Sequence, residues 1–186
     1  MIFSSHVLIE KVAPQVDLNN IRPAMEWFVL YTWPNAEKKV QIELINKHYE
    51  VFLPSVRTLR LWKNRQKKWI DQVLFPGYIF VYTIQNQLYH VTRIPKVVTC
   101  VQFAGKPSVI RDVEIECIKK MISFDEELLV TTQFFEGEKV RIIRGPFRGY
   151  EGTLVTFNGK SRFGIQLSEI NHSVLINISS RDLEKL

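Results

Sequence analysis

The sequence predicts an α+β protein in two parts: an amino-terminal antiparallel sheet with helices, then a small all-β barrel at the carboxy terminus. Strand-like and helical patterns alternate over residues 25–124, whereas residues 134–186 hold only short β-rich segments separated by turn residues. Residues 125–133 are acidic and weakly patterned, so we assign them as a linker. Residues 1–24 lack a clean period, and we expect a poorly ordered extension there; a helix or an added strand is the alternative.

The first part opens with a strand at residues 27–31, where Trp-Phe-Val-Leu-Tyr is a run of β-formers. Pro34 suits the first turn of a helix, and apolar residues then recur at helical spacing as far as His48. A second strand covers residues 50–53 and ends at Pro54. This order gives the β-α-β beginning of the sheet.

The next segment, residues 57–69, is basic and contains no acid. Leu and Trp residues interleave with the charges, and Asn64-Arg65-Gln66 can turn the chain, so we predict a protruding hairpin. Basic side chains that neutralise phosphates supply most of the affinity for nucleic acids. The hairpin is therefore a candidate nucleic-acid contact, and the alternative is a solvated hairpin whose charges serve solubility. Its basic residues are Arg57, Arg60, Lys63, Arg65, Lys67 and Lys68.

Residues 74–82 predict a further strand, with Pro76-Gly77 at its entry. Successive side chains of a strand point to opposite faces, so Ile79 and Val81 share one face and the aromatic residues share the other. If Ile79 and Val81 face the helices, the aromatic face needs another cover.

The aromatic face is our candidate protein interface. A contiguous exposed aromatic patch marks such an interface, whereas the alternative is that one or two of the rings complete the core. Residues from the first strand and from the entry to this strand can join the patch. We expect an interface formed by Tyr31, Phe75, Tyr78 and Phe80.

The first part continues with a short helix at 85–91, a strand at 97–103 and a turn at 105–107. Asp112 is a plausible N-cap for a last helix, whose apolar pattern fades after Phe124. The barrel then follows as about five short strands. These lie near residues 139–144, 150–157, 162–167, 173–178 and 181–184.

A glycine pattern in the barrel is the most informative motif of the chain. Gly145-Pro146 is a turn dipeptide, and Phe147 reads as core. Gly149 and Gly152 lie where a strand must bend sharply or adopt a positive φ, which only glycine does at little cost.

Composition excludes several function classes. The net charge is +6, and residues 25–125 carry 15 Lys or Arg against 9 Asp or Glu, which favours phosphate-bearing or acidic partners. The two cysteines and four histidines show no metal-ligand or catalytic spacing, and no glycine loop of the phosphate-binding type follows a strand. No apolar run approaches the roughly 20 residues that span a bilayer. We expect a cytoplasmic monomer with no metal, cofactor, membrane segment or enzymatic activity.

Together these motifs resemble the NusG family of transcription elongation factors over roughly residues 26–186. The glycine pattern resembles the KOW motif of small SH3-like barrels, and the first part is similar to the family's NGN domain. The hairpin and the compact linker resemble specialised paralogues of the RfaH or UpxY kind. In the first part, the resemblance rests on Trp27-Phe28-Val29-Leu30-Tyr31, Ala36-Glu37-Lys38-Lys39, Val51-Phe52-Leu53-Pro54 and Leu74-Phe75-Pro76-Gly77-Tyr78-Ile79-Phe80-Val81.

The resemblance implies a protein that binds bacterial RNA polymerase at the clamp helices of the largest subunit and suppresses pausing and termination of particular operons. It places Lys38 and Lys39 in the region where specialised members read DNA of the transcription bubble. The KOW barrel would recruit a ribosomal protein or the termination factor Rho. Two alternatives stay open: a housekeeping NusG-type factor, and a KOW protein that binds RNA or the ribosome.

Overall fold

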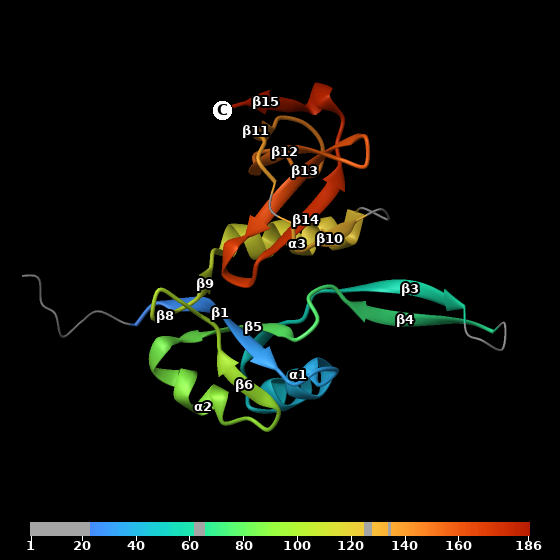
Figure 1. Ribbon diagram of the computed structural model, residues 1–186. Coiled ribbons are helices and arrows are strands. Elements are labelled where there is room, and N and C mark those ends of the chain that lie inside the picture. Colours follow the sequence, from blue (N-terminus) through green and yellow to red (C-terminus); the bar gives the residue numbers. More distant parts are fainter. Residues whose placement is uncertain (1–22, 62–65, 125–127, 134) are drawn as a thin grey trace, which may run out of the picture.

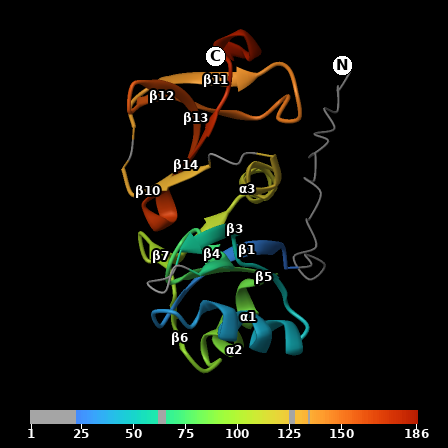
Figure 2. The same cartoon turned by 90° about the vertical axis from the view of Figure 1, so that its right-hand side faces the viewer.

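Two β-structures lie one above the other, with helix α3 (Asp112–Phe124) between them (Figures 1 and 2). The lower structure is a sheet with helices beneath it, and the upper one is all β. The expected α+β class is therefore confirmed. The computed structural model describes residues 23–61, 66–124, 128–133 and 135–186.

The lower sheet is antiparallel, and two helices cover its lower face (Figure 1). These helices are α1 (Glu37–Asn46) and α2 (Leu88–Thr92), and a 3-10 turn at Gln85–Gln87 leads into α2. The strands are β1 (Met25–Thr32), β2 (Glu50–Phe52), β5 (Tyr78–Ile84), β6 (Val97–Cys100) and β9 (Val109–Ile110). Their order is β2-β5-β1-β6, and β9 also pairs with β1.

The side chains of β5 alternate between two cores. Ile79 and Val81 pack with Leu44 of α1 beneath the sheet. Phe80 faces the other way and packs in a core that includes Ile118 of α3. The aromatic face of the strand thus has the second cover that the alternation requires.

The strand expected at residues 74–82 begins only at Tyr78. The preceding residues form a turn in which the Tyr78 N–H donates to the Phe75 carbonyl at 3.0 Å. Gly77 has a φ of +85°, which is outside the strand region and which glycine adopts at little cost.

A two-stranded ribbon projects sideways from the sheet (Figure 1). Its strands are β3 (Ser55–Leu61) and β4 (Lys67–Val73), and Leu59 lies directly opposite Trp69. A second, much smaller ribbon follows β6 and consists of β7 (Gln102–Phe103) and β8 (Lys106–Pro107).

Helix α3 is capped by Arg111 and not by Asp112, which is its first helical residue. The Arg111 carbonyl accepts the N–H of Ile115 at 3.2 Å, and the Arg111 N–H donates to the Glu114 carboxylate at 3.1 Å. Glu114, at the third helical position, thus accepts a hydrogen bond from a backbone N–H at the start of the helix. This contact explains why the N-cap is Arg111, one residue earlier than expected.

The upper structure is a six-stranded antiparallel sheet of order β10-β14-β13-β12-β11-β15. Its first strand, β10, lies inside the stretch that we assigned as linker and pairs with β14. Two 3-10 turns, Ser168–Ile170 and Ser180–Asp182, precede β14 and β15. The strands are β10 (Leu129–Thr131), β11 (Glu138–Ile142), β12 (Glu151–Phe157), β13 (Lys160–Leu167), β14 (His172–Asn177) and β15 (Leu183–Lys185).

The motif glycines do two different things. Gly145 and Gly149 have φ values of +77° and +91°, so they provide the backbone conformation of the turn. Gly152 provides space, because a Cβ there would lie 2.5 Å from the Phe163 ring. Phe147, between them, is buried and packs 6.1 Å from the ring of Phe124.

Candidate functional site

The aromatic turn, residues 75–78, is fixed from two sides. The Gly77 N–H donates to Oε1 of Glu37 at 2.7 Å, and the Gly77 carbonyl accepts the Thr32 N–H at 2.8 Å. Both partners are buried. A charge-assisted hydrogen bond in a buried site is short and strong, so α1 and β1 together hold the turn that presents Tyr78.

The four residues of the expected interface lie together, but their exposure differs from the expectation. Tyr31 is 39% exposed and its ring lies 5.5 Å from that of Tyr78, which is half-buried. Phe75 and Phe80 are completely buried and pack edge to face at 6.0 Å. The four residues therefore do not form a freely exposed aromatic patch.

The barrel and α3 cover the aromatic face of the lower sheet. The His172 ring at the start of β14 lies 5.4 Å from Phe75 and 5.7 Å from Tyr78. One continuous core joins the upper face of the lower sheet, α3 and the inside of the barrel. Alternation in the sequence shows which side chains share a face, but contacts between segments about 100 residues apart decide what covers that face.

The uncovered side of Tyr31 and Tyr78 borders a hollow of about 460 Å³. Thr99, Cys100 and Gln102 also line it. Both tyrosines thus keep an accessible edge, and His172 packs against the ring of Tyr78.

The thiols of the chain are held in their protonated form. Burial raises the pKa of Cys100 to about 11. Burial also raises the pKa of Cys117, to about 12, although the charge of Lys120 acts in the opposite direction. The thiolate is the reactive form, so neither thiol is an activated nucleophile. Among the described residues, no group of His, Cys, Asp and Glu is arranged to hold a metal ion.

The described basic side chains of the β3–β4 ribbon are exposed, and so are Leu59, Leu61 and Trp69. Arg57, Lys67 and Lys68 are exposed, and the Arg57 guanidinium lies 5.5 Å from the centre of the Trp69 ring. Lys63 and Arg65 lie outside the described residues, as does the side chain of Arg60.

Lys38 and Lys39 point to different neighbours. Lys38 pairs with Asp71 of the ribbon at 3.8 Å, and both side chains are well exposed. Lys39 lies beside Lys96, which follows α2, and its charge lowers the pKa of Lys96. Sequence reasoning missed Lys96 because nothing in the sequence around it indicates that Lys39, 57 residues earlier, is its neighbour.

Sequence reasoning also missed Glu37 and His172. Glu37 reads as an ordinary charge in the first turn of a helix, and only its burial reveals a structural role. His172 begins β14, and nothing near it in the sequence indicates its contact with the lower sheet.

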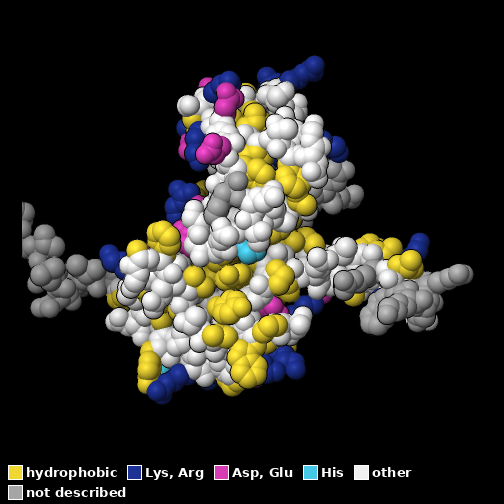
Figure 3. All heavy atoms as spheres, viewed as in Figure 1, with side chains coloured by type: hydrophobic (Ala, Val, Ile, Leu, Met, Phe, Trp, Pro, Cys, Tyr) yellow, Lys and Arg dark blue, Asp and Glu magenta, His cyan; other side chains and the backbone are white. Residues whose placement is uncertain are grey.

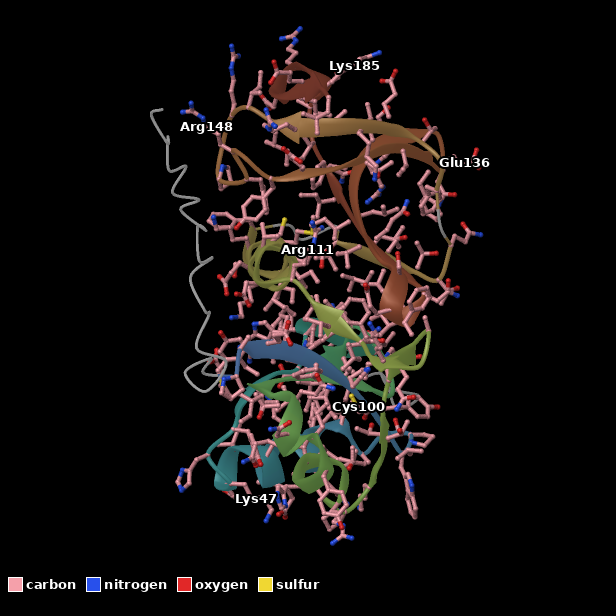
Figure 4. All side chains as sticks on the ribbon, turned by 90° about the vertical axis from the view of Figure 1, so that its left-hand side faces the viewer. Lys47, Cys100, Arg111, Glu136, Arg148 and Lys185 are labelled. Carbon is pink, nitrogen blue, oxygen red and sulfur yellow. The ribbon has the colours of Figure 1, made fainter. Side chains whose placement is uncertain are left out.

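In the KOW motif, the glycines shape the turn and Phe147 packs in the core. Basic side chains flank the motif on the surface. Arg144 and Arg148 are exposed, and Arg148 projects outward from the barrel (Figure 4). Within the described part of the chain, no helix is long and apolar enough to cross a membrane.

The fold and these surfaces define a binding protein of two structural parts, in which a buttressed aromatic turn lies under a small barrel and a basic ribbon projects to the side. The family model described as "Transcription termination factor nusG" matches residues 25–119, half of the chain. The chain belongs to the NusG family of transcription termination and antitermination factors.

The relatives align along almost their whole length. The NusG protein of Pseudomonas aeruginosa is 27% identical over 177 residues, which cover 88% of this chain and 99% of that protein. The NusG protein of Bacillus subtilis is 26% identical over 175 residues, or 86% of this chain and 98% of that protein. A solved structure described as "Domain interaction in Thermotoga maritima NusG" covers 88% of this chain and 98% of its own, with 23% identity and a TM-score of 0.47.

Proposed function

We propose that this chain is a specialised NusG-type factor that binds bacterial RNA polymerase through the aromatic turn and suppresses pausing and termination of particular operons. The observation that carries the proposal is the double anchoring of Gly77 by Glu37 and Thr32. It fixes the backbone next to Tyr78 and Tyr31, and preorganised aromatic side chains are effective anchors at protein interfaces. By family resemblance, the partner is the clamp helices of the largest polymerase subunit.

The barrel lies on this surface, so full engagement of the polymerase requires the barrel to leave it. The contact of His172 with Phe75 and Tyr78 then competes with the polymerase for the same rings. A ligand that binds only the open form shifts the equilibrium by its differential affinity for the two forms. A released barrel is free to recruit a second partner, and a ribosomal protein or Rho is our candidate.

The ribbon is the proposed contact with DNA of the transcription bubble. Arg57, Lys67 and Lys68 supply exposed cations, and its one acid, Asp71, already pairs with Lys38. Such contacts position a protein on a phosphate backbone without reading sequence. The ribbon and the aromatic turn together would bridge polymerase and nucleic acid. This bridge would favour the elongating state over the paused one by the difference in its binding free energy to the two states.

The first test is binding of the full chain to core RNA polymerase near physiological salt. Tyr31→Ala/Tyr78→Ala should weaken binding by at least about tenfold, because these are the anchors with an accessible edge. The matched control is Tyr89→Ala, an exposed tyrosine on α2. Circular dichroism and urea unfolding establish that each variant is folded. Absence of binding by the wild-type chain would overturn the proposal and favour an RNA-binding or ribosome-associated role.

The second test separates a specialised from a housekeeping factor. Transcription in vitro is followed through a terminator on templates with and without the upstream region of the gene cluster that encodes the chain. A specialised factor increases readthrough only on the first template. Equal effects on both templates would instead identify a housekeeping factor.

A further inference from the structure

One face of the β3–β4 ribbon exposes large apolar side chains. Leu59, Leu61 and Trp69 are between 44% and 64% exposed, although side chains of these types are usually withdrawn from water. In the described part of the chain the two strands pair only with each other. Figure 3 shows hydrophobic side chains beside basic ones on the ribbon, at the right of the view. A two-stranded ribbon is marginally stable alone, so a partner that covers this face would stabilise it.

The register of the ribbon determines which side chains share this face. Alternate residues of a strand point to the same side, and so do residues that lie directly opposite each other in paired strands. Leu59 lies opposite Trp69, so their neighbours two positions away in each strand belong to the same face. We call this set the ribbon face, and its members are Arg57, Leu59, Leu61, Lys67, Trp69 and Asp71.

The ribbon face carries opposite charges at its two ends. Lys67 lies at the outer end of β4 and Asp71 lies near the base, with Trp69 midway between them. Lys67 has no ion pair among the described residues, and Asp71 has one, to Lys38 at 3.8 Å with both groups well exposed. Exposed pairs of this kind contribute little to stability. Asp71 is therefore available to a stronger partner.

This placement makes the ribbon face complementary to itself. If two copies lie face to face with their ribbons in opposite directions, Lys67 of each copy meets Asp71 of the other. The apolar side chains around Trp69 then meet at the centre. Ribbons in the same direction would bring Lys67 against Lys67 and would push the two sheets into the same space. A two-fold axis through the centre of the face generates the favourable arrangement.

A hollow of about 1070 Å³ lies beside the base of the ribbon. Trp69 and Asp71 line it from the ribbon, and Phe124 and Leu129 line it from the end of α3 and from β10. Phe124 is exposed and Leu129 is half-buried, so this wall is apolar and open. With the ribbons in opposite directions, the outer end of one ribbon lies over the base of the other. Leu61, at that outer end, then reaches the hollow.

We propose that two copies of this chain associate through their ribbon faces, packed about a two-fold axis with the ribbons in opposite directions. Leu59 and Trp69 of both copies form the apolar centre, and two Lys67–Asp71 ion pairs flank it. A phosphate backbone would use the cations of this face but would leave its leucines without apolar contacts. The inference goes beyond the proposed function and does not depend on it.

The size of the ribbon face predicts a weak dimer. Strands of 7 residues at about 3.3 Å per residue are about 23 Å long, and two of them make a face about 10 Å wide. A standard interface buries about 800 Å² on each partner, so this face and the wall of the hollow together form a small one. The chain should therefore be a monomer when dilute, as expected from the sequence, and a dimer when concentrated.

The test is sedimentation velocity of the full chain without polymerase or nucleic acid, from about 5 to about 300 µM, the range in which small interfaces form. The sedimentation coefficient of the wild-type chain should rise with concentration towards that of a dimer. Lys67→Asp sets carboxylates against each other in the dimer, and Asp71→Lys sets ammonium groups against each other. Each should raise the dissociation constant at least about tenfold at low salt. The charge-matched control is Lys106→Asp, at an exposed lysine of β8.

Mixing the two charge variants gives the sharpest measurement. An opposite-direction pair of one Lys67→Asp chain and one Asp71→Lys chain restores both ion pairs with reversed sign. The equimolar mixture should therefore dimerise as the wild-type chain does, although each variant alone stays monomeric. A folding defect in either variant cannot produce this recovery. Salt should weaken both the wild-type dimer and the mixed one, because their ion pairs lie near solvent.

The apolar centre is tested separately. Leu59→Thr/Leu61→Thr keeps residues that favour strands and leaves every charge in place, and it should weaken the dimer about tenfold. The matched control is Ile42→Thr/Ile45→Thr, at two exposed isoleucines of α1. Circular dichroism verifies that each variant is folded.

Three results would overturn the inference. They are a wild-type chain that stays monomeric throughout the concentration range, a mixture of the charge variants that does not associate, and equal weakening by the control variants. If the wild-type chain is monomeric but a chain without residues 1–22 dimerises, the amino-terminal segment and not a second copy occupies the ribbon face. If the chain is always monomeric and Leu59→Thr/Leu61→Thr weakens polymerase binding, the face belongs to the polymerase.

Discussion

Lys119 and Lys120 are neighbours in α3, yet their ammonium groups lie over rings of different structural layers. Lys119 Nζ is 5.4 Å from the centre of the Trp27 ring in the lower sheet, and Lys120 Nζ is 4.9 Å from that of Tyr150 in the barrel. The helix therefore packs on both sides, and the barrel rests on the sheet largely through it.

Removal of the His172 ring should loosen the contact between barrel and sheet. His172→Ala deletes the edge-to-face contacts with Phe75 and Tyr78, and each such pair contributes about 0.5–1.5 kcal/mol. Tyr78 should then be nitrated faster by tetranitromethane, as followed by mass spectrometry. His90→Ala, at an exposed histidine of α2, is the control. An unchanged rate at Tyr78 would show that His172 does not hold the barrel.

Gly77→Ala should destabilise the fold more than a comparable substitution in open space. An alanine at φ +85° is strained, and its Cβ would lie 3.0 Å from the Tyr31 ring. Gly105, at φ +76°, has no atom within 4 Å, so Gly105→Ala measures strain alone. Urea unfolding should give a decrease of about 1–3 kcal/mol for Gly77→Ala and less for Gly105→Ala. Equal decreases would contradict a role for the Tyr31 contact.

Glu37→Ala should cost about 1–3 kcal/mol of unfolding free energy, because it leaves the buried Gly77 N–H without an acceptor. Glu37→Gln keeps an acceptor oxygen and should be less destabilising. The control is Glu43→Ala, at an exposed position of the same helix. If the Gln and Ala variants are equally unstable, the carboxylate charge and not the hydrogen bond is what matters.

Gly152→Ala should unfold the barrel more easily, by about 1–3 kcal/mol as for other overpacked sites. The new Cβ would meet the Phe163 ring at 2.5 Å and the Gly164 carbonyl at 2.6 Å. A second change, Phe163→Leu, removes the ring but not the carbonyl. A double-mutant cycle should therefore show partial and not complete coupling.

The two thiols make stability fall at alkaline pH. Their pKa values are raised in the folded chain, to about 11 for Cys100 and about 12 for Cys117, so the folded state holds its protons after the unfolded state has released them. The stabilisation is present below the ordinary thiol pKa of about 8.5 and disappears as the pH rises through the folded values.

Unfolding in urea at about pH 8 and about pH 10 measures this dependence. Cys117→Ala should show a smaller fall between the two than the wild-type chain. Native thiols should also react slowly with Ellman's reagent near neutral pH and rapidly in denaturant. Fast reaction in the native state would contradict the protonated, buried thiols.

The sequence predicted local structure well where a strong periodic pattern and its turn signals agree. The alternation of Ile79 and Phe80 between two faces, the ribbon around Trp69 and the positive φ of Gly149 were all readable from the chain. Each depends on neighbours within a few residues, and local sterics and hydrophobic periodicity set such features.

What the sequence did not predict depends on contacts between distant segments. The burial of Phe75 depends on His172, and the lowered pKa of Lys96 depends on Lys39. Strand β10 was missed because its pattern is short, and it is defined by pairing with β14. The sequence thus grouped Tyr31, Phe75, Tyr78 and Phe80, which lie together, but it did not predict what covers them.

The position of the barrel has a consequence for how the chain behaves between encounters with its partners. An uncovered sheet face that exposed Phe75, Phe80 and Trp27 would be a large apolar patch and would favour self-association. With the barrel and α3 in place, these rings are withdrawn from solvent. The same packing therefore protects the free chain from aggregation, and a fragment truncated after α3 should be poorly soluble.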